Sequence, residues 1–227
     1  SNYMAENREA VTLASSELLN EIEPTSVDEV SLIDWDPDGE RKMLAAMLYS
    51  QSQLGEAQLI SVIDRMTSDE KYSLARSYVG DRTNRRHRPG RALERLNYRF
   101  DILSDYGGFR DMQRHRLLTI EWQSLTPCHG YEVPEDIKAC GLTDKYVSAL
   151  ERSKDLYEAM IKTFPEQASY AVSMAYRIRY VMQFNAREAL HMLELRSQPQ
   201  GHPNYRRVAQ AMYRQIGDVA GHNIVAG

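Results

Sequence analysis

Arginine is concentrated in one stretch of this chain. Ten arginines lie between residues 82 and 116, at Arg82, Arg85, Arg86, Arg88, Arg91, Arg95, Arg99, Arg110, Arg114 and Arg116. A guanidinium group is planar, permanently charged and suited to paired hydrogen bonds with phosphate or carboxylate. The stretch therefore predicts an anion-binding site. The simpler alternative is a solvated basic face that acidic helices elsewhere balance, because exposed charges contribute little individually.

The triplet Arg114-His115-Arg116 is the sharpest feature of this stretch. A helix is expected over Phe109–Arg116, after a chain break at Gly107-Gly108. At a helix end, alternate residues point in roughly opposite directions. The two arginines could then share a ligand only if the helix ends there, or if the ligand is long, such as a dinucleotide.

Other chemistries have weaker support in the sequence. Ser124 and His129 do not form a hydrolase pattern, because no G-x-S-x-G elbow precedes a helix. His191 lies at helical spacing from Glu188 and Glu194, but the pattern is not H-E-x-x-H. No metal site is therefore predicted.

The overall composition limits the protein class. The chain has 227 residues, a net charge of -4 and 42% hydrophobic residues, enough for one substantial core. No apolar run approaches the 18 residues of a membrane span, so no membrane partner is expected. The acidic balance argues against a nucleic-acid partner, although an arginine-rich binder remains a minor alternative. Cys128 and Cys140 lack a C-x-x-C spacing, so a reducing, cytoplasmic location is expected.

Helices outnumber strands in the pattern, which predicts an α+β fold with helices packed on a mixed or antiparallel sheet. Alternating apolar residues predict strands, and 3.6-residue periodicity predicts helices. The expected strands are 29–35, 96–102 and 176–184, with an irregular or strand-like segment over 119–133. The expected helices are 10–22, 40–51, 55–66, 68–78, 109–116, 144–164, 186–196 and 205–216.

Residues 1–27 are expected to hold an expression remnant and a leading helix or linker. Ser1-Asn2 precedes the first Met and is typical of a protease scar, and no secretory signal follows. The main domain is expected over 28–220.

Several motifs together resemble one known family. Arg114-His115-Arg116, seven further residues and then Ser124 resemble the RHR-x7-S signature of flavin-dependent thymidylate synthases, the ThyX family. Gly108-Phe109-Arg110 leads into the triplet as in that family. Asn185-Ala186-Arg187-Glu188, followed by His191 and by Glu194-Leu195-Arg196, is similar to its C-terminal block. The similarity covers about residues 28–217.

The resemblance implies methylation of dUMP to dTMP with methylenetetrahydrofolate, FAD and NADPH, in a homotetramer whose sites are shared between subunits. It implies FAD contacts from Arg114, His115, Arg116, Glu94, Asn185, Ala186, Arg187 and His191. It implies substrate contacts from Gln123, Ser124, Arg114 and Arg196, with Arg196 as the catalytic group that polarises the uracil. Guanidinium groups suit this role because they stabilise a developing anion.

The chain departs from the family on the substrate side. Asp111 stands where the family has a glutamine that touches dUMP, and Thr126 and Ser169 stand where it has arginines. A glutamate expected two residues before Ser124 is Trp122, and the N-terminal flavin motif survives mainly as Glu94.

These departures indicate how much dUMP affinity the chain is expected to lose. A charge-assisted hydrogen bond contributes about 1.5–3 kcal/mol, so two lost arginines would weaken dUMP binding by roughly 10²- to 10⁴-fold. The sequence therefore favours a ThyX-like domain that binds flavin but turns over dUMP poorly or not at all alone. The alternative is a non-catalytic ThyX-like domain that stabilises or regulates an active homologous half.

Overall fold

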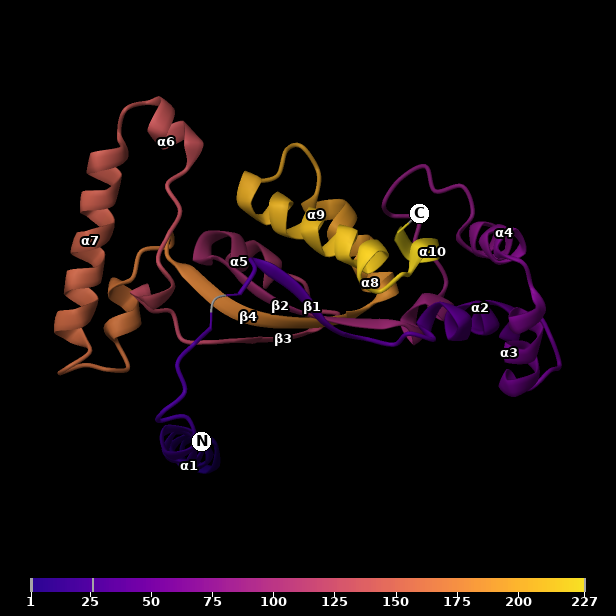
Figure 1. The fold of residues 1–227 in the computed structure, drawn as a ribbon, viewed down its shortest axis with the longest axis horizontal. Coiled ribbons are helices and arrows are strands. Elements are labelled where there is room, and N and C mark those ends of the chain that lie inside the picture. Colours follow the sequence, from indigo (N-terminus) through magenta and orange to yellow (C-terminus); the bar gives the residue numbers. More distant parts are fainter. Residues whose placement is uncertain (1, 26, 227) are drawn as a thin grey trace.

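The computed structural model describes residues 2–25 and 27–226, and its centre is a four-stranded sheet (Figure 1). The strands are β1 (Val30–Trp35), β2 (Asn97–Asp105), β3 (Thr119–Trp122) and β4 (Arg177–Asn185). Their order across the sheet is β1-β2-β4-β3, and all three neighbouring pairs are antiparallel. The α+β prediction is confirmed, and the sheet is antiparallel rather than mixed.

The two central strands bury every second residue, as their alternating sequences predict. Tyr98 lies opposite Phe184, and Phe100 lies opposite Met182. All four side chains are at most 2% exposed. The rings of Phe100 and Phe184 stack with centroids 5.6 Å apart. This pairing fixes which sheet face the helices cover, because a one-residue slip would expose the apolar set.

Three helices cover that face: α5 (Tyr106–Met112), α8 (Ala186–Arg196) and α9 (Pro203–Asp218) (Figure 1). α8 continues directly from the last residue of β4, so the sheet fixes where this helix begins. The α9 side chain of Gln215 donates to the carbonyl of Val30 and accepts from the amide of Leu32. These two bonds hold the edge strand β1 to the helix layer.

The remaining elements lie at the two ends of the sheet (Figure 1). At one end are α2 (Gly39–Tyr49), α3 (Glu56–Arg65), α4 (Ser68–Val79), the 3-10 turn η1 (Arg91–Arg95) and α10 (Asn223–Ala226). At the other end are η2 (Pro127–His129), α6 (Glu135–Ala139), α7 (Thr143–Met160) and η3 (Ala168–Ala171). None of the helices within 2–25 and 27–226 combines the length and apolar character of a membrane span.

The helix expected over Phe109–Arg116 is placed differently in the structure. α5 begins at Tyr106, and Gly107-Gly108 lies in its first turn instead of breaking the chain. The Asp105 carboxylate accepts from the amide of Gly108 at 2.7 Å and caps the helix. α5 ends at Met112, so Arg114-His115-Arg116 lies in the following loop and helical periodicity does not govern it.

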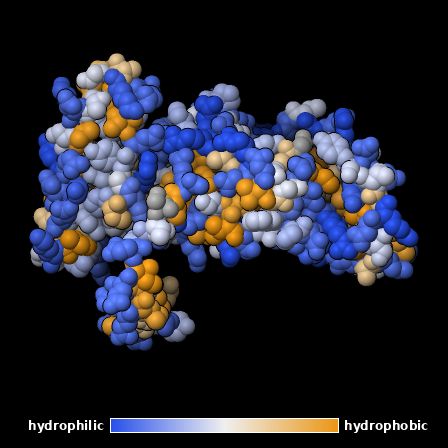
Figure 2. Space-filling view, viewed as in Figure 1, coloured by the Kyte–Doolittle hydropathy of each residue, from blue (hydrophilic) through white to orange (hydrophobic). Residues whose placement is uncertain are grey.

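The first helix, α1 (Asn2–Leu18), starts and ends earlier than the expected 10–22 and buries no residue. Apolar side chains such as Val11, Leu13 and Leu18 are more than 60% exposed. Figures 1 and 2 show α1 apart from the rest of the molecule, with apolar surface on its side. Ser1 and Ser26, within the predicted leading segment 1–27, lie outside the described residues, and the division at 27 stays a prediction.

Candidate functional site

A cavity of about 470 Å³ lies between the loop after α4 and the N-terminal half of α8. Five arginines line it, four from residues 82–91 and one from α8: Arg82, Arg85, Arg88, Arg91 and Arg187. Its other lining residues are Pro89, Glu94, Leu117, Asn185, Glu188 and His191. The cavity therefore brings together four of the predicted FAD contacts, at Glu94, Asn185, Arg187 and His191.

Ion pairs hold the arginine-rich loop against the helices. Arg187 donates through Nε to the Pro89 carbonyl at 2.9 Å and through Nη1 to Glu94 Oε1 at 2.7 Å. Arg91 also binds Glu94, at 2.9 Å. The hydrogen bond from Arg91, with a smaller contribution from Arg187, holds the pKa of the Glu94 carboxyl below its usual range. Glu94 is thus a structural anion that fixes two cations at the cavity wall.

Arg82 is held in the same way by α8. Both of its terminal nitrogens bind the Glu194 carboxylate, and its Nε donates to the His87 carbonyl at 2.7 Å. Within residues 2–25 and 27–226, in contrast, neither Arg85 nor Arg88 forms an ion pair. Two guanidinium groups of the cavity are therefore available to an anionic ligand.

His115 connects the RHR loop to α8. It is 8% exposed, and its Nδ1 lies 3.1 Å from Oε1 of the buried Glu188. Arg196 donates through Nε to His115 Nε2 at 3.1 Å. Arginine has no acceptor, so Nε2 must present its lone pair, and the ring proton lies on Nδ1 and is donated to Glu188. The partners therefore fix one neutral tautomer.

This tautomer bears on metal binding. Ligand atoms of His115, Glu188 and His191 all lie within 4.8 Å of one another, a spacing that could suit a metal ion. However, His115 has no lone pair to offer while Nδ1 carries the proton and Nε2 accepts from Arg196. The hydrogen bonds thus favour a structural triad of Glu188, His115 and Arg196 over a metal centre.

Arg196, the predicted catalytic residue, is 12% exposed and anchored on several sides. Besides His115, it donates to the backbone carbonyl of Asp111 at 2.5 Å, near the end of α5. Its Nη1 lies 3.5 Å from the Asp111 carboxylate, and its guanidinium lies 5.3 Å from the Tyr205 ring centroid. Arg114, which is largely exposed, approaches the same carboxylate oxygen at 3.4 Å.

The other four predicted FAD contacts, Arg114, His115, Arg116 and Ala186, are not among the residues that line the cavity. Ala186 is fully buried in the hydrophobic core, and its amide donates to the Leu96 carbonyl at 2.8 Å, so its side chain does not face the cavity. Arg116 is exposed in the loop. Asn185 lines the cavity and also caps α8, since its side-chain oxygen accepts from the Glu188 amide at 2.9 Å.

Two of the predicted substrate contacts, Gln123 and Ser124, are not among the residues that line the arginine-rich cavity. β3 runs antiparallel to β4, and Trp122 pairs with Tyr180, five residues before Asn185 at the start of α8. At about 3.3 Å per residue, that end of β3 lies roughly 17 Å along the sheet from Asn185. Gln123 and Ser124 follow Trp122 and are exposed there.

Arg82, Arg85, Arg88 and Arg91 belong to the stretch that the sequence predicts to bind an anion, but they are not among the FAD contacts that the resemblance implies. The structure places all four in the cavity wall. The signal for them was the density of arginine, which does not distinguish a cavity from a solvated face. The sequence drew attention to Glu188 in the C-terminal block and to Asp111 in place of a glutamine. It did not predict their contacts with His115 and Arg196, because each contact joins residues more than 70 positions apart.

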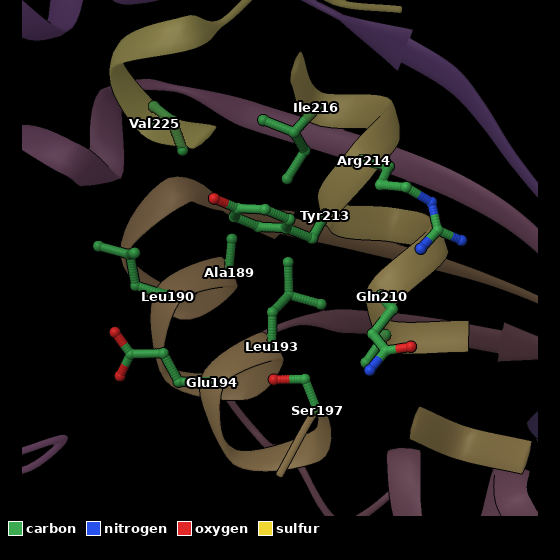
Figure 3. A pocket seen from close by; sticks show the side chains of 11 residues that line it. Ala189, Leu190, Leu193, Glu194, Ser197, Gln210, Tyr213, Arg214, Ile216 and Val225 are labelled. Carbon is green, nitrogen blue, oxygen red and sulfur yellow. The ribbon is translucent and has the colours of Figure 1, made fainter. Parts of the chain in front are cut away.

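A second cavity, of about 350 Å³, lies between α8 and α9 (Figure 3). Apolar side chains, including Leu190, Leu193, Ile216 and Val225, line most of it, with Tyr213 among them. It uses a different side of α8 from the arginine-lined cavity. Its two charged lining residues, Glu194 and Arg214, have opposite signs, and the rest of the wall is mostly apolar, so it suits an anionic ligand less well than the arginine-lined cavity does.

Comparison with known proteins identifies the family. The family model described as "Thymidylate synthase complementing protein" matches residues 31–221. The chain therefore belongs to this family, as the motif resemblance predicted. It is 41% identical over 194 residues to a UPF0159 protein of Chlamydia pneumoniae and 35% identical over 204 residues to one of Thermoplasma acidophilum. These alignments cover 86% and 88% of the chain but only 36% and 40% of the two relatives.

Solved structures agree in fold. The flavin-dependent thymidylate synthase ThyX of Helicobacter pylori, complexed with FAD and dUMP, matches with a TM-score of 0.59 and 17% identity. The match covers 82% of this chain and 93% of that one. The UMP/dUMP methylase PolB of Streptomyces cacaoi, bound with 5-Br dUMP, matches with a TM-score of 0.63 and 16% identity, over 86% and 93%.

Proposed function

We propose that this chain is a flavin-binding ThyX-like domain, with FAD held in the arginine-lined cavity. The supporting observation is the pair Arg85 and Arg88, which lack a carboxylate partner among the described residues in a cavity where Arg82, Arg91 and Arg187 each have one. The donor set fits a diphosphate, because guanidinium groups bind its oxygens in pairs. A dinucleotide cofactor carries such a group.

The remaining wall would orient the cofactor. Arg187 and Glu94 form an ion-paired edge, and Asn185 and His191 offer polar contacts from the cap of α8 and from α8 itself. Leu117 supplies apolar surface beside the RHR loop. The flavin, when bound, supplies the redox chemistry of methyl transfer. The protein would bind it, fix its orientation and hold His115 in one tautomer through Glu188 and Arg196.

The reaction proposed for the family site is methylation of dUMP with methylenetetrahydrofolate and NADPH. Gln123 and Ser124 would then need to approach the cofactor cavity of a neighbouring subunit, because within one chain they lie at the far end of β4. This separation favours a homo-oligomer, such as a tetramer, or pairing with a homologous domain. Thr126 and Ser169, where arginines are expected, favour weak turnover of dUMP. A cytoplasmic location suits these co-substrates.

The cofactor proposal is tested by titrating the purified protein with FAD and following flavin absorbance. Removing both Arg85 and Arg88 in R85A/R88A should weaken FAD binding by roughly 10²- to 10⁴-fold, since each charge-assisted bond contributes about 1.5–3 kcal/mol. R152A is the control, because Arg152 is an exposed arginine on α7. Equal FAD affinity in R85A/R88A and the natural protein would contradict the proposal.

A second candidate is a non-catalytic domain that stabilises or regulates an active homologous half. Two observations favour it. The Asp111 carboxylate forms ion pairs with Arg114 and Arg196, and the chain spans only about two fifths of the relatives' length. This role predicts FAD binding without NADPH-dependent dTMP formation by this chain. Formation of dTMP by this chain alone at rates typical of enzymes would exclude it.

A further inference from the structure

Two arginines of the site converge on one internal carboxylate. Asp111 Oδ1 lies 3.4 Å from Arg114 Nη1 and 3.5 Å from Arg196 Nη1. The Asp111 side chain is 31% exposed, so solvent and ligands can reach the oxygens between the two guanidinium groups. The carboxylate therefore occupies the position that a ligand anion would take.

We infer that Asp111 is a specificity-determining residue: its carboxylate acts as a built-in counter-ion that excludes anionic ligands from the Arg114–Arg196 pair. This inference deepens the proposed function and rests on it, because it concerns the nucleotide side of the same site. An incoming anion must displace Asp111 from both arginines and then remain beside its negative charge. Like charges at such distances are unfavourable even near a protein surface.

The position of Arg196 does not depend on the Asp111 side chain. Arg196 keeps its bonds to His115 Nε2 and to the Asp111 backbone carbonyl, neither of which uses the carboxylate. The neutral, nearly isosteric D111N should therefore leave the guanidinium in place and free it to bind an anion. Arg114, which is 75% exposed, would be freed in the same way.

The test compares a charged ligand with its neutral counterpart by calorimetry: dUMP against deoxyuridine. D111N should bind dUMP roughly 10- to 100-fold more tightly than the natural protein, the range of one charge-assisted bond. Deoxyuridine affinity should change less than about twofold, because only the phosphate carries the competing charge. The control D64N removes the same charge from the Arg41–Asp64 pair on α2 and α3, and should change neither affinity.

Two further measurements keep the inference falsifiable. In the natural protein, R114A should leave dUMP affinity within about twofold, since Asp111 already pairs with Arg114 and keeps the anion away. In D111N/R114A, much of the gain should disappear. Equal gains for dUMP and deoxyuridine in D111N, or a tenfold loss in R114A alone, would overturn the inference. If D111N does not fold, the dUMP affinity of R114A made in the natural sequence still tests the inference.

FAD absorbance in the same samples separates this inference from the proposed function. If no variant binds FAD, the proposed cofactor fails, while a charge-selective gain in D111N would still support the role of Asp111. If FAD binds and D111N shows no gain for dUMP, the inference fails and the cofactor proposal stands.

Discussion

Near α8, Arg82, Arg91 and Arg187 each bind a carboxylate. At the far end of β4, in contrast, Gln123 and Ser124 lie on an exposed segment. The first region is held by contacts such as His115–Glu188, between segments far apart in sequence. The second is a short edge strand followed by the single turn η2. On the proposed function, we therefore expect the cofactor side to depend on contacts within one chain and the nucleotide side to depend on a neighbouring subunit.

Removing the Glu188 carboxylate of α8 is expected to have the largest effect on the free energy of unfolding. E188A leaves the Nδ1 proton of buried His115 without its acceptor, so we expect a loss of about 2–4 kcal/mol in the free energy of unfolding. Urea denaturation measures this loss. E188Q keeps an acceptor oxygen and should lose less, and E158A, on the exposed surface of α7, should change stability by less than about 0.5 kcal/mol. Equal losses in E188A and E158A would show that the triad is not a stabilising unit.

Adding the arginine that the resemblance expects at position 126 tests whether the region around Gln123 and Ser124 contacts the nucleotide. Thr126 lies in this region and caps η2 by accepting from the Cys128 amide at 3.3 Å. T126R should bind dUMP roughly 10- to 100-fold more tightly than T126A, which loses the same cap without adding a charge. Calorimetry with both variants measures the difference. Indistinguishable affinities would mean that position 126 does not face the nucleotide phosphate.

The titration of His129 reports on the region at the far end of β4. Burial, and to a smaller extent the charge of Arg179, lowers the pKa of His129 below its ordinary value of 6.5. Between the two values the unfolded chain binds more protons, so this contribution to stability is present above about pH 6.5 and is lost as the pH falls. NMR titration of the His129 ring should give a midpoint below 6.5, and R179M should move it upward only in part. A midpoint above 6.5 would contradict the direction.

The smallest effects are expected at Gln123 and Ser124. Both side chains are exposed, so Q123A and S124A should each change the free energy of unfolding by less than about 0.5 kcal/mol. FAD affinity should stay within about twofold if one chain completes the cofactor side. A tenfold loss of FAD affinity in S124A would mean that Ser124 of a neighbouring subunit reaches the flavin.

The sequence predicted the repeating elements well because they depend on local periodicity. The alternating residues of β2 and β4 and the helix over 186–196 appear nearly where expected. Prediction failed at Gly107-Gly108, where two glycines normally indicate a break. The Asp105 cap instead begins α5 there, and the helix ends four residues earlier than expected, at Met112 instead of Arg116.

The sequence by itself determined the α+β fold class, the main strands and the family, because apolar spacing and the RHR and C-terminal motifs are local signals. Only the tertiary structure decided that Arg85 and Arg88 line a cavity, that His115 has one tautomer, and that Asp111 pairs with two arginines. It also decided that Ser124 does not line the arginine-rich cavity within one chain. The physical reason is that charge acts over distances in space, and folding alone sets which of the chain's 60 charged groups meet.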